Sequence, residues 1–259
     1  MKTSDIQGLL VDLSGTICID DQPVPGAIEA LERIRNAGIP VGFVTNTTSK
    51  PRSAIIKKLA EMQLKVDESE IFTATVAADR HLKSAGYRKC NFLLKDDVLE
   101  DITGCEYSEE DPEAVVVGDL GEAFTFGRLN RAFNNLVDGA KLYALAQNRY
   151  FEKEGVLQID VGGFVAALEY SADTKADLIG KPAASFFKAA AGAIGINPEN
   201  VAMVGDDIEA DCQGGMDAGM KGILVKTGKY RPELADKSGI TPTASLTSIA
   251  EVPQYLGLI

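Results

Sequence analysis

One short segment near the start of the chain carries residue types that can do chemistry. The apolar residues 8–11 are followed by Asp12, and Ser14, Gly15 and Thr16 come soon after. An uninterrupted apolar run of this length is typical of a parallel strand covered on both faces. Open α/β sheets bind their ligands at the carboxyl ends of such strands. Asp12 is therefore well placed for chemistry, although an aspartate that only caps a turn would fit the same pattern.

Polar residues also follow other apolar segments of the chain. They are Thr45 and Asn46 after one expected strand, Lys181 just before a helix, and Asp206, Asp207 and Asp211 after another strand. The carboxyl ends of neighbouring parallel strands lie at the same edge of a sheet, so these side chains can converge. Carboxylates suit Mg²⁺, while lysine, hydroxyl and amide donors suit phosphoryl oxygens. The pattern predicts a site for Mg²⁺ and a phosphate group.

The elements that would position these residues alternate between strand and helix patterns. Strands are expected at residues 8–12, 41–44, 71–73, 201–204, 222–225 and 243–244, with helices between them and a last helix capped by Ser245. This order is typical of a doubly wound parallel sheet. The middle of the chain repeats the alternation, with strands at 91–94, 114–117, 141–146 and 156–159. We therefore predict a Rossmann-like α/β core from residues 1–76 and 178–259, with a second α/β domain, residues 77–177, inserted into it.

Composition excludes several classes of protein. The net charge of −12 over 259 residues argues against a nucleic-acid surface, which needs clustered lysine and arginine. No apolar run approaches the length of a membrane span, and no signal-peptide pattern is present. The four cysteines are scattered and there is one histidine, so a zinc cluster is not expected. We expect a cytoplasmic protein with reduced thiols and neither nucleic-acid nor membrane partners, and homo-oligomerisation is left open.

Four motifs give the chain a family resemblance. They are Asp12-Leu13-Ser14-Gly15-Thr16, Thr45-Asn46, Gly180-Lys181-Pro182 and Gly205-Asp206-Asp207 followed by Asp211. In this order they resemble the motifs of the haloacid dehalogenase (HAD) superfamily. The large insertion between the second and third motifs is similar to that of subfamily IIA, which carries an α/β cap domain. The resemblance covers essentially the whole chain and implies a Mg²⁺-dependent phosphatase acting on a small phosphorylated substrate.

The resemblance also implies a nucleophile and a metal site. Asp12 would attack phosphorus and form an aspartyl-phosphate, which divides one difficult step into two. Asp12 and Asp206 would bind Mg²⁺ together with the backbone carbonyl of Ser14. Asp12 and Ser14 would also contact the phosphate.

Further residues take supporting roles in the same resemblance. The Thr45 hydroxyl and the Asn46 amide would bind the phosphoryl group, and Lys181 would neutralise its charge. Asp211 would orient Lys181 or a metal-bound water, and Asp207 could share that work.

Ser14 departs from the family pattern. Most phosphatases of the superfamily carry an acid two residues after the nucleophile, which protonates the leaving group and activates water. General acid–base catalysis contributes roughly 10²–10⁴-fold, or about 3–5.5 kcal/mol of barrier. Alkyl phosphates should therefore suffer most, while pyrophosphate, aryl phosphates and protonated P–N compounds should suffer least. A cap residue or a water relay could replace the missing acid.

Two other functions remain open from the sequence. Carbon–halogen hydrolysis also uses an aspartate nucleophile. It needs no metal, however, so the acidic Gly205-Asp206-Asp207 cluster argues against it. A phosphate-binding or interaction protein with vestigial hydrolysis would explain Ser14. The presence of all four of Asp12, Thr45, Lys181 and Asp206 argues against that alternative.

Overall fold

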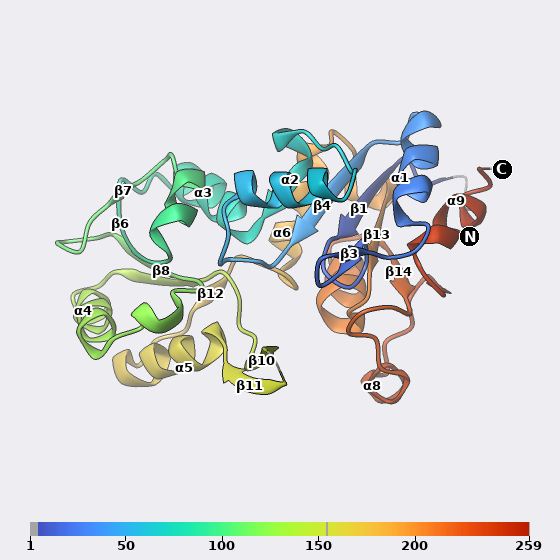
Figure 1. The fold of residues 1–259 in the computed structure, drawn as a ribbon. Helices are drawn as coiled ribbons and strands as arrows, with labels where there is room; N and C mark the ends of the chain where they lie inside the picture. The colour runs from blue at the N-terminus through green and yellow to red at the C-terminus, as the bar shows by residue number, and fades with distance from the viewer. Residues whose placement is uncertain (1–4, 154, 259) are drawn as a thin grey trace. The chain divides into compact units, whose positions relative to one another are not determined.

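The computed structural model describes residues 5–153 and 155–258, which form two compact units. The core unit comprises Met1–Thr45, Ser53–Phe72 and Lys181–Ile259, and the inserted unit comprises Asn46–Arg52 and Thr73–Gly180. Both units contain parallel sheets with helices, as predicted (Figure 1). None of the described helices combines the length and the apolar character needed to cross a membrane.

A six-stranded sheet organises the core unit. Its order is β15 (Ala244–Leu246), β14 (Lys221–Val225), β13 (Val201–Gly205), β1 (Gly8–Asp12), β4 (Val41–Thr45) and β5 (Ile71–Thr73). β1 is central and runs parallel to both of its neighbours, with Leu9 opposite Ala202 on one side and Val41 on the other. β1, β4 and β13 are buried along their whole length, which explains why each reads as an unbroken apolar run. Their carboxyl ends therefore lie at one edge of the sheet.

Helices connect the strands of the core unit. They are α1 (Ala27–Asn36), α2 (Arg52–Glu61), α6 (Ala184–Ala193), α7 (Gly214–Asp217), α8 (Pro232–Ser238) and α9 (Val252–Tyr255), with the π-helix η6 (Ile208–Gln213) and the short 3₁₀ helices η2 (Glu68–Glu70), η5 (Pro198–Asn200) and η7 (Ile249–Glu251). Leu31 and Ile34 of α1 pack with Leu9, Val11 and Phe43 in the apolar core that fixes β1. A small hairpin, β2 (Cys18–Ile19) and β3 (Gln22–Pro23), follows β1.

One predicted cap is wrong. Ser245 lies within β15, and Ser248 is the residue whose side chain accepts the N–H of Ala250 at the start of η7. The strand continues two residues further than its apolar pattern predicts, because Leu246 pairs with Val225.

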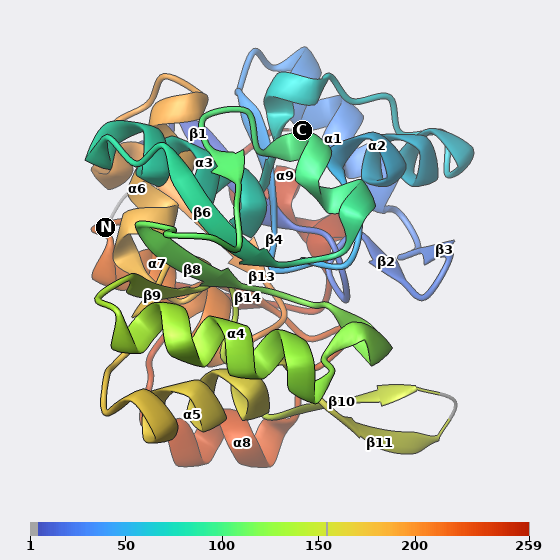
Figure 2. The ribbon, with the colours of Figure 1, turned by 90° about the vertical axis from the view of Figure 1, so that its left-hand side faces the viewer.

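The inserted unit has a sheet of its own. Its order is β12 (Asp177–Leu178), β9 (Lys141–Ala144), β8 (Ala114–Val117), β6 (Lys89–Leu93) and β7 (Glu106–Tyr107), all parallel. Its helices are α3 (Ala74–Ala85), α4 (Phe126–Val137) and α5 (Val161–Ala172), with the 3₁₀ helices η3 (Asp96–Asp101) and η4 (Gly121–Ala123). α4 and α5 lie together on one side of this sheet (Figure 2). The expected strand at 156–159, β11 (Val156–Ile159), pairs only with β10 (Tyr150–Lys153) in an antiparallel ribbon outside the sheet.

Candidate active site

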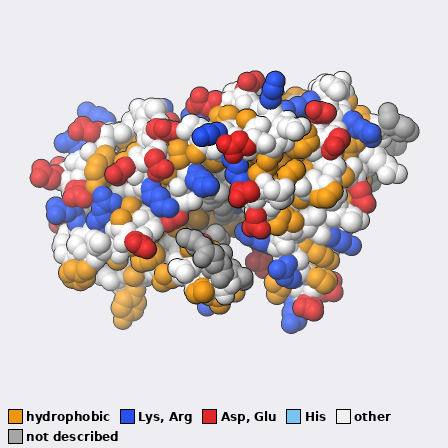
Figure 3. Space-filling view, in the orientation of Figure 1, with side chains coloured by type: hydrophobic (Ala, Val, Ile, Leu, Met, Phe, Trp, Pro, Cys, Tyr) orange, Lys and Arg blue, Asp and Glu red, His pale blue; other side chains and the backbone are white. Residues whose placement is uncertain are grey.

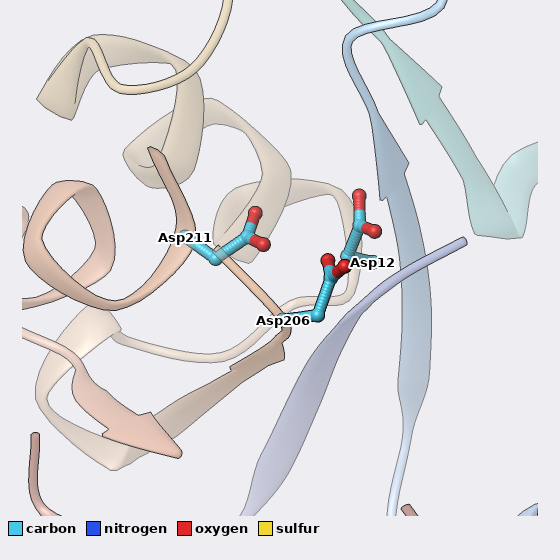
Figure 4. Close-up of side chains that lie close together, drawn as sticks. All are labelled: Asp12, Asp206 and Asp211. Atoms are coloured by element: carbon cyan, nitrogen blue, oxygen red, sulfur yellow. The ribbon is translucent and has the colours of Figure 1, made fainter. Parts of the chain in front are cut away.

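Three buried carboxylates meet at the carboxyl edge of the core sheet. Asp12 is the last residue of β1, Asp206 directly follows β13, and Asp211 lies in η6. Their side chains are almost fully buried, with 5%, 2% and 1% of each residue exposed. One oxygen from each carboxylate lies within 4.8 Å of the others. Figure 4 shows the Asp211 carboxylate directed toward those of Asp12 and Asp206.

Lys181 joins two of these carboxylates. Its Nζ donates to Asp12 Oδ1 at 2.5 Å and to Asp211 Oδ1 at 2.7 Å. Burial alone would lower the pKa of Lys181, but the charges of Asp12 and Asp211 and the two hydrogen bonds raise it above its usual range. Lys181 is therefore a fixed cation beside the predicted nucleophile.

The carboxylates outnumber this buried cation. Burial raises the pKa of Asp206 to about 6 and that of Asp211 to about 7, in each case against the opposing effect of nearby cations. Burial also raises the pKa of Asp12, although Lys181 partly opposes the shift. Buried carboxylates ionise readily only where further positive charge compensates them. A divalent cation with oxygen preference fits this donor set, and Asp12 and Asp206 are the residues that would hold Mg²⁺.

Asp211 is held in place from two sides. Besides the bond from Lys181, its Oδ2 accepts the backbone N–H of Asp207 at 3.2 Å. Asp207 in turn accepts the backbone N–H groups of Glu209 and Ala210, at 3.1 and 2.9 Å, and so caps η6. This geometry suits Asp211 to positioning Lys181 and suits Asp207 to shaping the turn that carries Asp211.

Two glycines enclose Asp206. Gly15 and Gly228 have φ values of +91° and +51°, which favour glycine. A Cβ atom on either one would collide with Asp206 Oδ2. The backbone N–H of Lys229 donates to the same oxygen at 2.5 Å, and the Thr227 hydroxyl donates to the Gly15 carbonyl at 2.5 Å. The backbone thus approaches Asp206 more closely than a side chain would permit.

The remaining predicted site residues differ in their surroundings. Ser14 is exposed, within a tight loop in which Gly15 N–H donates to the Cys18 carbonyl at 2.6 Å. Thr45 is buried at the end of β4, the strand paired with β1. Asn46 belongs to the inserted unit and lies next to Gly180: a Cβ atom added to Gly180 would be 2.8 Å from Asn46 Oδ1. The structure therefore brings Asp12, Asp206, Asp211 and Lys181 into one cluster, and the proposed contacts of Ser14, Thr45 and Asn46 with a ligand remain predictions.

Comparisons with known proteins identify the family. A model described as haloacid dehalogenase-like hydrolase matches residues 9–108, and a second, described as HAD-hydrolase-like, matches residues 178–252. Haloacid dehalogenase-like hydrolase domain-containing protein 2 from Bos taurus is 44% identical over 93% of this chain and 92% of its own length. The chain belongs to the haloacid dehalogenase-like hydrolase family.

Other members of this HAD family agree in sequence and structure. Phospholysine phosphohistidine inorganic pyrophosphate phosphatase from Xenopus laevis is 35% identical over 97% of this chain and 92% of its own. The crystal structure of 4-nitrophenylphosphatase from Thermotoga maritima superposes with a TM-score of 0.91, at 28% identity, and covers 97% of this chain and 98% of that one. The predicted superfamily, the subfamily and the α/β core-and-cap fold class are confirmed.

The segment Thr227–Lys229 contacts Gly15 and Asp206 of the candidate site and was not among the residues predicted from the sequence. β14 was predicted at 222–225, and Thr227, Gly228 and Lys229 follow it in the same way that polar residues follow β1 and β13. The rule that polar residues after parallel strands meet at one edge would have found them.

Proposed function

We propose that this HAD hydrolase is a Mg²⁺-dependent phosphatase that acts through an aspartyl-phosphate on a small phosphorylated substrate. The observation that carries the proposal is the buried cluster in which Lys181 holds Asp12 Oδ1 while Asp206 lies alongside. The cluster supplies a nucleophile, a fixed cation and an excess of carboxylate charge at one strand edge.

The proposed reaction has two steps, formation of the aspartyl-phosphate and its hydrolysis. An Asp12 oxygen attacks phosphorus, the bond from phosphorus to the leaving group breaks, and the leaving group departs with the electron pair. Water then attacks the phosphorus of the aspartyl-phosphate, which releases orthophosphate and restores the Asp12 carboxylate. Lys181 stabilises the charge on the phosphoryl oxygens in both steps, and Asp211 keeps its ammonium in position. Bound Mg²⁺ would supply further positive charge to the transferring group and orient it.

Ser14 determines which substrates suit this site. It is exposed and carries no carboxyl group, so the position that commonly holds a general acid cannot protonate a leaving group. We therefore propose that pyrophosphate, aryl phosphates and protonated P–N compounds are turned over better than alkyl phosphates. The relative from Xenopus laevis is named as an inorganic pyrophosphate phosphatase, and the one from Thermotoga maritima as a 4-nitrophenylphosphatase. Both names support this proposed preference for substrates with good leaving groups.

A cytoplasmic location completes the proposal. All four cysteines, Cys18, Cys90, Cys105 and Cys212, are free thiols, which is usual in a reducing compartment.

Turnover of p-nitrophenyl phosphate and pyrophosphate, with Mg²⁺ and with a chelator, tests the proposal. We expect Mg²⁺-dependent release of phosphate by the wild type and its loss in Asp12→Asn. Tight phosphate binding without turnover of either substrate would instead favour the phosphate-binding alternative. Activity that survives Asp12→Asn would exclude Asp12 as the nucleophile.

A further inference from the structure

We infer that a cavity beside Asp206 is a second oxyanion subsite, which holds the charged leaving group of substrates such as pyrophosphate. The inference rests on the proposed phosphatase function and names the substrate class of that site. The cavity measures about 430 Å³ and lies within the core unit between η6, the segment after β14, and α8. Its volume is within the range of pockets that bind small ligands.

Three cationic side chains line this cavity, from Lys229, Arg231 and Lys237. Among the side chains of residues 5–151 and 155–258, no carboxylate oxygen lies within 4.0 Å of their charged nitrogens. Arg231 Nη1 donates to the backbone carbonyls of Gly228 and Tyr230, at 3.1 and 2.9 Å, which fixes the guanidinium at the cavity. Figure 3 shows basic side chains around α8 at the lower right of the molecule. These cations are available for an anionic ligand.

The acidic residues of the lining are Asp206, Asp207 and Glu209. Asp206 accepts the backbone N–H of Lys229 and belongs to the carboxylate cluster with Asp12. Asp207 accepts two backbone N–H groups of η6. Glu209 is exposed at the rim. Two of the three acids are thus already committed to partners, and the cations are not balanced by ion pairs.

The cavity adjoins the proposed site of reaction. Asp206 belongs to both, and the bond from Lys229 N–H to Asp206 Oδ2 joins the cationic segment to the carboxylate cluster. The charge of Lys229 also acts on Asp12, where it is one of the influences that lower the carboxyl pKa against the effect of burial. A substrate with two linked oxyanions could place one at Asp12 and the other against Lys229, Arg231 and Lys237.

Cations in this cavity would compensate for the general acid that is missing at Ser14. When the phosphorus–oxygen bond of pyrophosphate breaks, the electron pair remains on the leaving phosphate. Fixed cations stabilise that developing charge without transferring a proton. Guanidinium and ammonium groups are suited to phosphate oxygens, and arginine can donate two parallel hydrogen bonds.

The test compares two substrates in variants of the cavity. Arg231→Gln and Lys237→Gln are each assayed with pyrophosphate, which has a second oxyanion, and with p-nitrophenyl phosphate, which lacks one. We expect the ratio of the two kcat/KM values to fall about twofold to fivefold for each cation removed, the size of effect usual for a charged contact near solvent. Lys226→Gln is the matched control, because Lys226 is exposed on the same segment but does not line the cavity. A ratio that changes no more in the cavity variants than in the control would overturn the inference.

A binding measurement separates this inference from the proposed function. Calorimetric titration of Asp12→Asn with methylenediphosphonate and with orthophosphate, in the presence of Mg²⁺, needs no turnover. We expect Arg231→Gln, added to that background, to weaken the binding of methylenediphosphonate about twofold to fivefold more than that of orthophosphate. Equal weakening of both ligands would refute the second subsite even in an active phosphatase. Selective weakening in a protein that turns over neither substrate would support the subsite and refute only the catalytic proposal.

Discussion

Replacing Lys181 by methionine should destabilise the core unit in a pH-dependent way. Lys181 Nζ lies 2.5 Å from Asp12 Oδ1 and 2.7 Å from Asp211 Oδ1, and all three side chains are buried. Breaking a buried ion pair by removing one partner typically costs about 3–5 kcal/mol, since the other charge stays buried and uncompensated. Methionine retains much of the lysine's length, so the loss should arise from charge rather than from a cavity.

The sign of the pH effect follows from the carboxyl groups. The pKa of Asp211 is already raised to about 7 by burial, and removal of Lys181 would raise it further, together with that of Asp12. A group whose folded pKa exceeds its unfolded value stabilises the fold at low pH and loses that contribution as the pH rises through the folded pKa. The destabilisation of Lys181→Met should therefore be about 3–5 kcal/mol near pH 8 and about 1–2 kcal/mol near pH 5, where the carboxyls take up protons.

Urea unfolding of metal-free protein at both pH values measures this difference. Lys188→Met is the control, because Lys188 is exposed on α6 and should change the free energy of unfolding by no more than about 0.5 kcal/mol. Equal losses at the two pH values would refute the reasoning, as would a loss at high pH no larger than that of the control.

Three further predictions concern the same site. Ser14→Asp should raise kcat/KM for an alkyl phosphate by about 10²-fold or more and for an aryl phosphate much less, and an equal gain for both would contradict the leaving-group reasoning. Gly228→Ala should lower the melting temperature and weaken Mg²⁺ binding, because its Cβ would collide with Asp206 Oδ2, whereas Gly192→Ala, with open space around it in α6, should do neither. The apparent affinity for Mg²⁺ should fall about tenfold per pH unit below the Asp206 pKa of about 6, because a proton then competes for the carboxylate. If calorimetry measured the same Mg²⁺ affinity above and below this pKa, Asp206 would not be a metal ligand.

The strands that carry the site could be predicted because they are buried on both faces. β1, β4 and β13 appear in the sequence as apolar runs that end at Asp12, Thr45 and Gly205. A parallel sheet then requires their ends to share one edge, which is enough to bring Asp12 and Asp206 together without any knowledge of side-chain contacts.

Other features depend on contacts that leave little trace in the sequence. Val156–Ile159 of β11 is an apolar segment like the strands of the sheet, yet all four of its residues are exposed and it pairs only with β10, so its separation from the sheet of the inserted unit could not be read from periodicity. The approach of Gly228 to Asp206 depends on a positive φ and on a hydrogen bond across 23 residues, neither of which has a local signal. The bond between Lys181 and Asp211 likewise depends on the course of η6.

Detection of the covalent intermediate tests the central proposal most directly. Wild-type protein mixed with Mg²⁺ and ³²P-labelled pyrophosphate is quenched in acid within the first turnover, digested, and searched for labelled peptides. We predict label on the peptide that contains Asp12, released by hydroxylamine as expected of an acyl phosphate, and no label in Asp12→Asn. Rapid release of phosphate with no label on Asp12, or label that persists in Asp12→Asn, would contradict a mechanism through an aspartyl-phosphate at this residue.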